Sequence, residues 1–254
     1  AVHLPAQIAK AAAQGAQMVF TPEMSGLLDR DRSRAAASVV AEAGDVVLAA
    51  VRQAEAEHRV WVQLGSLALK GDGGKFVNRG FLISPDGEIT ARYAKIHLFD
   101  VALGTESWRE SAAYQAGEEA VLAQTPWGGL GMTICYDVRF PALHRALAEA
   151  GAAMIAVPAA FTRPTGAAHW HVLLRARAIE TGCWVIAAAQ TGEHQDGRAT
   201  YGHSLVVSPW GEVVLDMGEA PGIGLCDIDL GEVAAARAKV PALDHARPFR
   251  LLRA

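Results

Sequence analysis

Short apolar runs alternate with helix-like stretches along most of the chain. The runs have the length of single strands, and the longer stretches place apolar residues at helical spacing or are rich in alanine. The predicted strands cover residues 16–20, 60–69, 154–159 and 184–189, and the predicted helices cover residues 5–14, 41–59, 142–150 and 167–181. Such alternation is typical of an α/β protein in which helices cover the faces of sheets.

Two predicted hairpins in distant parts of the chain resemble each other. Residues 81–89 read FLISPDGEI, and residues 205–213 read LVVSPWGEV. In both, proline supplies the fixed φ of the second turn residue, and glycine supplies a positive φ. The likeness has two interpretations: good hairpin turns look alike, or the chain holds two sheets in a two-fold arrangement.

The size and charge of the chain narrow the classes of function. Its 254 residues, 51% of them hydrophobic, are enough to fill a large core. The net charge of −4 is small and dispersed, so we expect no nucleic-acid partner. No apolar run approaches the roughly 20 residues of a membrane helix, and the first residues lack the pattern of a signal peptide, so we expect no membrane partner.

The three cysteines are Cys135, Cys183 and Cys226, and none lies in a C-x-x-C pair. An odd number argues against a disulfide framework, and free thiols suit a reducing cytoplasm, which is the location we expect. Cys183 and Cys226 lie in strand-like runs. We interpret both as core residues, because free cysteine is among the most buried residue types.

Cys135 stands where a strand ends and a helix follows. It closes the apolar run 129–135, and the predicted helix 142–150 comes soon after it. At such a turn, backbone N–H groups and the N-terminus of a helix can act on a thiol. The sequence therefore marks Cys135 as a candidate nucleophile.

Two more ionisable residues occupy strand ends. Glu23 follows Phe-Thr-Pro at the end of the strand 16–20, and Lys95 opens the segment KIHLFD after the second strand of the first hairpin. Taken singly, Glu23 is better interpreted as a surface carboxylate, Lys95 as a solvated lysine and Cys135 as a core thiol. The occurrence of all three at strand ends favours a catalytic set.

These segments resemble those of the nitrilase superfamily of carbon–nitrogen hydrolases, whose catalytic set is Glu, Lys and Cys in that order, and the likeness spans nearly the whole chain. It implies a four-layer αββα sandwich, with two sheets face to face and helices outside, as a single domain over residues 1–254. The family pattern also has a first strand, usually ending in glutamine. Here residues 1–4 lead directly into a helix, so we expect either that the chain is a fragment or that this strand is absent. An absent strand would expose a sheet edge or leave a gap in the core.

The resemblance assigns a role to each residue. Cys135 is the nucleophile, and Glu23 takes its proton and passes it to the leaving nitrogen. Lys95 and the backbone N–H of Tyr136 hold the oxyanion, where one donor is worth about 3 kcal/mol of barrier. A second glutamate between lysine and cysteine completes the family set. Glu110 is our candidate for it, and Glu106 is the alternative.

Histidines raise the rival possibilities of a Cys–His dyad and of a metal site. His169 and His171 are two residues apart in a predicted helix, so their side chains point to different faces. We therefore predict no metal site, and the resemblance implies no cofactor. His203 is expected to anchor a loop near the pocket rather than to act as a base.

The run from residue 169 to residue 211 resembles the deaminated glutathione amidase branch of the superfamily. The ω-amidase branch, which acts on α-ketoglutaramate, shares KIHLFD but differs around the AQTG segment. The implied function is hydrolysis of a terminal carboxamide on a small molecule to carboxylate and ammonia, through a cysteine thioester. A nitrilase acting on a C≡N group, and a catalytically silent binding or assembly member of the fold, remain open alternatives.

A substrate of this kind carries a carboxylate, so its pocket should offer cations or hydroxyls. The candidates are Thr162, Thr165, Arg139, Arg163 and Arg198. Arg139 also has a structural interpretation, as an ion-pair partner beside Cys135.

The resemblance further implies a homodimer or larger homo-oligomer. The expected contacts are the helix within residues 141–150 and the C-terminal segment 240–254. That segment contains two prolines and one phenylalanine with little periodicity, so it has no obvious core of its own to join.

Overall fold

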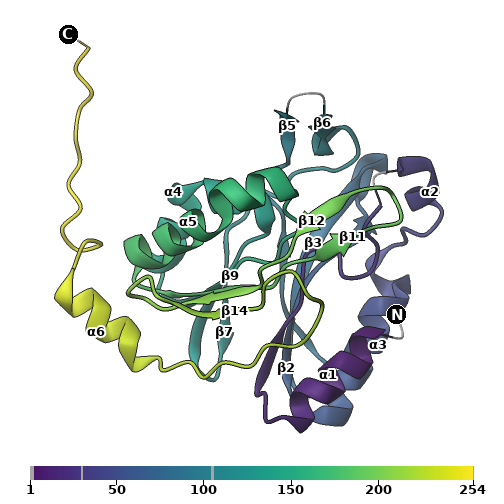
Figure 1. The fold of residues 1–254 in the computed structure, drawn as a ribbon, viewed down its shortest axis with the longest axis horizontal. Coiled ribbons are helices and arrows are strands. Elements are labelled where there is room, and N and C mark those ends of the chain that lie inside the picture. The colour runs from purple at the N-terminus through teal and green to yellow at the C-terminus, as the bar shows by residue number, and fades with distance from the viewer. Residues whose placement is uncertain (1–2, 30, 104–105, 254) are drawn as a thin grey trace.

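The structure, a computed structural model, describes residues 3–29, 31–103 and 106–253 (Figure 1). Its first sheet has the strand order β1-β2-β3-β4, with β1 parallel to β2 and the other pairs antiparallel. The strands are β1 (Met18–Phe20), β2 (Trp61–Lys70), β3 (Phe76–Ile83) and β4 (Ile89–Ala94). In this order β1 and β4 form the two edges.

The second sheet has the order β14-β13-β10-β9-β8-β7. Its strands are β7 (Val121–Thr125), β8 (Gly128–Met132), β9 (Ala152–Ala156), β10 (Trp184–Ala187), β13 (Leu205–Val207) and β14 (Val213–Asp216). Two separate hairpins complete the strands: β5 (Asp100–Leu103) with β6 (Glu106–Arg109), and β11 (Thr191–Glu193) with β12 (Ala199–Tyr201).

Helices cover the outer faces of both sheets (Figure 1). On the first sheet lie α1 (His3–Ala13) and α3 (Val46–His58), and on the second lie α4 (Pro141–Glu149) and α5 (Arg163–Thr181). The other helices in the described part of the chain are α2 (Arg32–Ala36), α6 (Gly231–Lys239) and the 3-10 helices η1 (Glu42–Gly44), η2 (Asp72–Gly74), η3 (Glu110–Ala112) and η4 (Cys135–Arg139). The α/β sandwich expected from the resemblance is confirmed.

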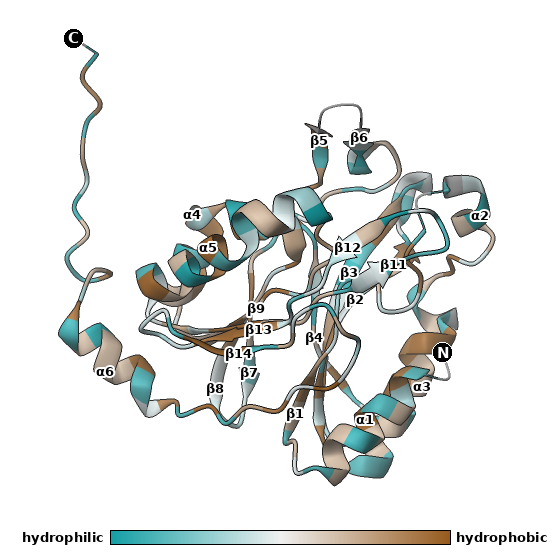
Figure 2. Cartoon of the chain, viewed as in Figure 1, coloured by the Kyte–Doolittle hydropathy of each residue, from teal (hydrophilic) through white to brown (hydrophobic). Residues whose placement is uncertain are grey.

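Alternation along the strands explains the layers. In β3, Phe81 and Ile83 pack with residues of α1 and α3, whereas Leu82 faces the core shared with the second sheet. Successive strand residues point to opposite faces, so one strand supplies both cores. In Figure 2 the central strands carry mostly apolar residues, while the outer helices mix apolar and polar ones.

The two matching hairpins occupy equivalent places in the two sheets. In one turn the N–H of Gly87 donates to the carbonyl of Ser84 at 2.8 Å, and in the other the N–H of Gly211 donates to the carbonyl of Ser208 at 2.9 Å. Each glycine carbonyl accepts a bond from an arginine of the covering helix: Arg52 of α3 at 2.7 Å and Arg175 of α5 at 2.8 Å. A repeated turn with a repeated helix contact supports the two-fold interpretation.

Two expectations about cysteines change in detail. Cys135 is the first residue of η4, a five-residue 3-10 helix, so the thiol does not stand at the N-terminus of α4. Cys183 is buried as expected, but Cys226 is only partly buried and lies in an irregular segment rather than in a strand. Among the described residues, no helix has both the length and the apolar character to cross a bilayer.

Candidate active site

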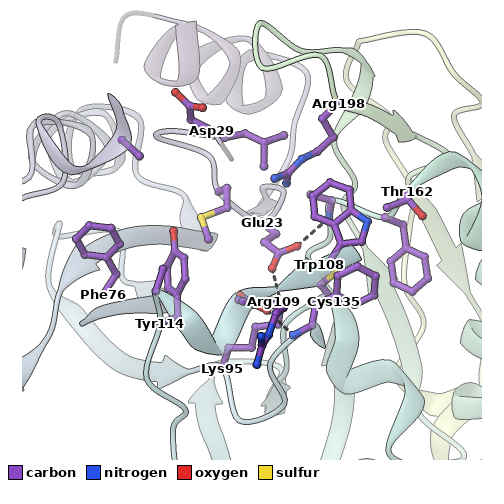
Figure 3. A pocket seen from close by; sticks show the side chains of 18 of the residues that line it. Glu23, Asp29, Phe76, Lys95, Trp108, Arg109, Tyr114, Cys135, Thr162 and Arg198 are labelled. Carbon is purple, nitrogen blue, oxygen red and sulfur yellow. Dashed lines mark hydrogen bonds and ion pairs between the residues drawn. The ribbon is translucent and has the colours of Figure 1, made fainter. Parts of the chain in front are cut away.

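The ends of the two sheets enclose a cavity of about 510 Å³ that contains the predicted catalytic residues. Glu23 follows β1 and Lys95 follows β4, both in the first sheet, whereas Cys135 follows β8 in the second. Figure 3 shows Glu23 at the centre, with Lys95 and Cys135 on one side of it and Tyr114 and Phe76 on another. The structure thus brings together three residues far apart in the sequence.

The carboxylate of Glu23 is buried and accepts hydrogen bonds at both oxygens. One oxygen accepts from Lys95 Nζ and from Asn78 Nδ2, each at 2.9 Å. The other accepts from the backbone N–H of Ala160 at 2.9 Å. Burial alone would raise the pKa of Glu23, but Lys95, Cys135 and Asn78 together hold it below its ordinary value. The carboxylate is therefore ionised at neutral pH.

Lys95 is held between two carboxylates. Its side chain is only 2% exposed, and Nζ donates to Glu23 and to both oxygens of Glu110, at 2.9 Å and 3.2 Å. Burial alone would lower the pKa of the ammonium, but the charges of Glu110 and Glu23 raise it well above its ordinary value. Lys95 therefore carries a fixed positive charge inside the cavity.

Glu110 is the glutamate that the structure places in this cluster. Besides Lys95, its carboxylate accepts the backbone N–H of Phe99 at 2.7 Å and Asn78 Nδ2 at 3.3 Å. The alternative, Glu106, has its backbone in β6, and its side chain lies outside the described part of the chain. Glu110 thus positions both the lysine and the segment that follows it.

Cys135 lies at the turn from β8 into η4 with a φ of 50°. This left-handed conformation costs a residue other than glycine about 1–2 kcal/mol, so surrounding contacts must hold it. Burial and the neighbouring Glu23 carboxylate raise the pKa of the thiol well above its ordinary value, despite the opposing effect of Lys95. The resting thiol is therefore protonated, beside a carboxylate that can accept its proton.

A buried carboxylate holds the turn at Cys135 in place. Asp137 accepts the hydroxyl of Tyr93 at 2.7 Å and the backbone N–H of Ile134 at 2.8 Å. Its other oxygen accepts the backbone N–H of His97 at 3.1 Å and lies 2.7 Å from the ring Nδ1 of His97. Tyr93 and His97 flank Lys95, so Asp137 joins the lysine segment to the cysteine turn.

The other predicted binding residues divide into two groups. Thr162 and Thr165 line the cavity, with their hydroxyl oxygens 2.8 Å apart, and Arg198 lines it as well. Arg163, by contrast, is exposed and lies 3.9 Å from Glu193.

Among the described residues that line the cavity, neither Arg139 nor Tyr136 is present. Arg139 is 3.3 Å from a ring nitrogen of His169, and its guanidinium lies 5.5 Å from the centre of the Phe161 ring. The contacts of Arg139 among the described residues thus include a histidine ring and an aromatic ring, and its interpretation as an ion-pair partner stays a prediction. The ring of Tyr136 packs against Phe99 and Phe140. The predicted role of Tyr136 as an oxyanion donor concerns its backbone N–H and not this ring.

Sequence reasoning missed several residues of the site. Asn78 bonds both glutamates, and the amide of Gln190 donates to the backbone carbonyl of Glu23 at 3.0 Å. Trp108 lines the cavity under the guanidinium of Arg198, 4.8 Å from ring centre to Cζ. An amide in a buried strand was a signal for Asn78. Nothing in the sequence marked Trp108, because the pairing of β6 with β5 places it.

The sequence model of the carbon-nitrogen hydrolase family matches residues 3–238. The chain belongs to this family. A protein of Synechocystis named deaminated glutathione amidase is 41% identical over 239 residues, which cover 91% of this chain and 86% of that protein.

Solved structures of this family agree with the fold. The NitFhit protein of Caenorhabditis elegans superposes with a TM-score of 0.88 at 38% identity, and the match covers 96% of this chain but only 60% of the NitFhit chain. An amidase from Nesterenkonia, solved as a mutant with acrylamide added to its active-site cysteine, has a TM-score of 0.78 at 28% identity. That match covers 94% of this chain and 90% of the amidase.

Proposed function

We propose that this carbon-nitrogen hydrolase is a thiol-dependent amidase whose preferred substrate is deaminated glutathione. The observation that carries the proposal is the closed cluster of Glu23, Lys95, Glu110 and Cys135 at the floor of one cavity. Relatives about 40% identical over most of their length carry that name, which supports the choice of substrate.

In the first half of the reaction, Cys135 attacks the amide carbonyl. A bond forms between sulfur and carbon while the thiol proton passes to Glu23. The carbonyl oxygen becomes an oxyanion, held by a Lys95 N–H and by the backbone N–H of Tyr136. Lys95 uses its three N–H donors on Glu23 and on both oxygens of Glu110, and the bond to Glu110 Oε1, at 3.2 Å, is the longest of the three. The oxyanion would take the donor of that bond, while each carboxylate keeps one bond to the ammonium.

The intermediate then collapses to a thioester. The carbon–nitrogen bond breaks as Glu23 returns its proton to the departing nitrogen. Water next attacks the thioester, giving a proton to Glu23, and the sulfur leaves as the acid is released. The proton on Glu23 restores the thiol, so one carboxylate serves both halves of the cycle.

The leaving group depends on the substrate. The scissile amide of deaminated glutathione joins its keto acid to cysteinylglycine, so its hydrolysis releases the amine of that dipeptide. The terminal carboxamide and the ammonia expected from the sequence therefore apply to α-ketoglutaramate and not to this substrate. With α-ketoglutaramate, ammonia is the group that leaves the same acyl group. The two substrates thus differ only on the side of the leaving group, which makes them a direct probe of the outer pocket.

The cavity offers groups for an anionic substrate. Arg109 and Arg198 line it, together with Thr162 and Thr165. Arg198 is 16% exposed and lies 3.6 Å from Asp196, so its charge is partly compensated and fixed in place. The cavity volume falls in the range of about 300–1,000 Å³ that is common for small-molecule sites.

The test is a side-by-side measurement of kcat/KM for deaminated glutathione, α-ketoglutaramate, glutamine, asparagine and a simple nitrile. The expected result is the highest value for deaminated glutathione, because remote binding energy lowers the barrier. The Cys135→Ala variant is the control and should be inactive with all five.

Other outcomes would change the assignment. A preference for α-ketoglutaramate by about tenfold or more would indicate an ω-amidase, since only the leaving group differs. Turnover of the nitrile alone would overturn the amidase assignment. No turnover of any compound would favour a silent binding member of the fold.

We also propose a cytoplasmic homodimer or larger homo-oligomer. The three cysteines are free thiols, and Phe249, Leu251 and Leu252 near the C-terminus are largely exposed apolar side chains. Exposed apolar residues of this kind often mark contacts between chains. Light scattering at micromolar concentration tests the assembly, and a clean monomer would refute it.

A further inference from the structure

Outside the catalytic cavity, three side chains from distant elements converge on one point. His171 lies in α5, His203 lies between β12 and β13, and Asp216 ends β14. One ligand atom from each lies within 4.8 Å of the others. Within the described residues, none of the three lines the cavity.

The distances suit a small cation. His171 Nε2 lies 3.0 Å from Asp216 Oδ2, and His203 Nδ1 lies 2.9 Å from Asp216 Oδ1. Zn²⁺ binds such atoms at about 2.0–2.2 Å in a tetrahedron, which places neighbouring ligand atoms roughly 3.3–3.5 Å apart. The three ligand atoms lie within 4.8 Å of one another, so a cation would draw the two imidazole nitrogens together by at most about 1.5 Å and would move the carboxylate away from each ring by about half an ångström or less.

The backbone around His203 is held before any ligand arrives. His203 has a φ of 54°, its N–H donates to the carbonyl of Gly218 at 2.7 Å, and its carbonyl accepts Trp170 Nε1 at 2.8 Å. The ring of Tyr201 stacks on the imidazole at 4.4 Å between centres. Such support from the surrounding residues fixes the direction of a ligand ring.

Asp216 is fixed in the same way. Its Oδ1 accepts the backbone N–H of Gly218 at 2.9 Å. His171 Nε2 and His203 Nδ1 lie 3.0 Å and 3.2 Å from its Oδ2, so one carboxylate oxygen is close to both rings.

We propose that His171, His203 and Asp216 form a site for a divalent transition-metal cation such as Zn²⁺. Two imidazole nitrogens favour zinc, cobalt, nickel or copper over magnesium or calcium, which prefer oxygen ligands. Three protein ligands leave a fourth position for water. The prediction of no metal site considered His171 with its neighbour along the helix, His169, whereas the fold places His171 beside His203 and Asp216.

Binding would join three separate elements. α5 begins beside Thr162 and carries Thr165 into the catalytic cavity, and the cation would tie this helix to the segments after β12 and at the end of β14. A ligand that binds only the folded state raises the melting temperature. The expected role of the metal is thus to stabilise the position of α5.

The test uses the Cys135→Ala protein, so that the catalytic thiol cannot bind the metal. Zn²⁺ is titrated in competition with a chelator, and Co²⁺ reports the ligand set through its visible absorption. We expect one cation per chain, a raised melting temperature, and no sulfur-to-cobalt charge-transfer band. His171→Gln and Asp216→Asn, in that background, should each weaken binding at least tenfold and remove the thermal shift, with circular dichroism confirming the fold.

The matched control is His169→Gln, which removes an exposed histidine of the same helix and should leave the affinity unchanged. Binding that survives in both His171→Gln and Asp216→Asn would place the cation elsewhere and overturn the proposal. So would the absence of Zn²⁺ binding in the Cys135→Ala protein, which would leave the cluster as a hydrogen-bonded contact only.

Discussion

Glu23 and Glu55 are both buried carboxyl groups, but their surroundings differ in kind. Glu23 lies where the two sheets meet, and three donors outside its own segment bond it: Lys95, Asn78 and the N–H of Ala160. Glu55 lies on the buried face of α3, and neither of its carboxyl oxygens has a hydrogen-bond partner among the described residues. Burial raises the pKa of Glu55 to about 9, whereas that of Glu23 stays below its ordinary value.

The difference shows that partners, rather than burial, decide the charge of an acid in this fold. Desolvation disfavours the charged form of both groups. At Glu23 an ammonium and directed N–H donors outweigh it, so the acid is an anion at neutral pH. At Glu55 no partner outweighs the desolvation, so the acid keeps its proton. Each prediction below removes one of the two acids or a partner of Glu23. They run from the largest expected effect to the smallest.

The largest effect is expected for Glu23→Gln. An amide keeps the shape of the side chain but cannot accept the thiol proton or activate water, so turnover should fall roughly 10²–10⁴-fold. The measurement is kcat with deaminated glutathione at neutral pH. A loss of less than about tenfold would mean that another group accepts the proton.

Lys95→Ala should follow, with a loss of at least about a hundredfold in kcat/KM, because it removes an oxyanion donor and the main partner of Glu23. Lys95→Arg should not rescue activity, since a planar guanidinium does not fit the place of a compact ammonium. Steady-state kinetics of both variants check this. Full activity in the arginine variant would contradict the compact geometry described here.

Asn78→Ala should have a smaller effect. It removes one hydrogen bond from Glu23 and a longer one from Glu110, but leaves Lys95 in place. One hydrogen bond to a charged group corresponds to roughly a tenfold loss in kcat/KM. An unchanged kcat/KM, with the fold intact by circular dichroism, would show that Lys95 and Ala160 suffice to hold Glu23.

Glu55→Gln should leave kcat/KM within about twofold of the wild type, because it lies far from the chemistry, and should change the pH dependence of stability. The folded protein keeps the Glu55 proton up to a pH of about 9, whereas an unfolded chain loses it near the ordinary value of 4.5. Between these values the free energy of unfolding of the wild type should fall with rising pH, by at most about 1.4 kcal/mol per unit from this group.

Denaturant unfolding at several pH values across that range measures the effect. Glu55→Gln should lose this part of the slope, while Glu57→Gln, an exposed neighbour on the same helix, should keep it. Equal slopes in all three proteins would mean that Glu55 is ionised in the folded state.

The contrast between the two acids also shows how much of the site could be predicted from the sequence. Glu23, Lys95 and Cys135 were predictable because each follows a strand end, where side chains of different strands meet. The contacts of Ala160 and Asp137 were not predictable, since they depend on which strands become neighbours. The amide of Asn78 in an apolar run indicated that it would have a partner, but not which one. Cys226 packs against the core but is only partly buried, because its apolar run forms an irregular segment instead of a strand. Similarly, the positive charge of Arg139 did not reveal that it would pack on aromatic rings.

The central claim is that Cys135 is the nucleophile and that ionised Glu23 accepts its proton. The most direct test of the nucleophile is mass spectrometry of enzyme quenched in acid during turnover. Deaminated glutathione and α-ketoglutaramate share one acyl group, so both should give the same added mass on the peptide that contains Cys135. Hydroxylamine should capture that acyl group as a hydroxamate, and Cys135→Ala should show neither adduct nor turnover. An acyl group on another residue, or full turnover by Cys135→Ala, would contradict the account.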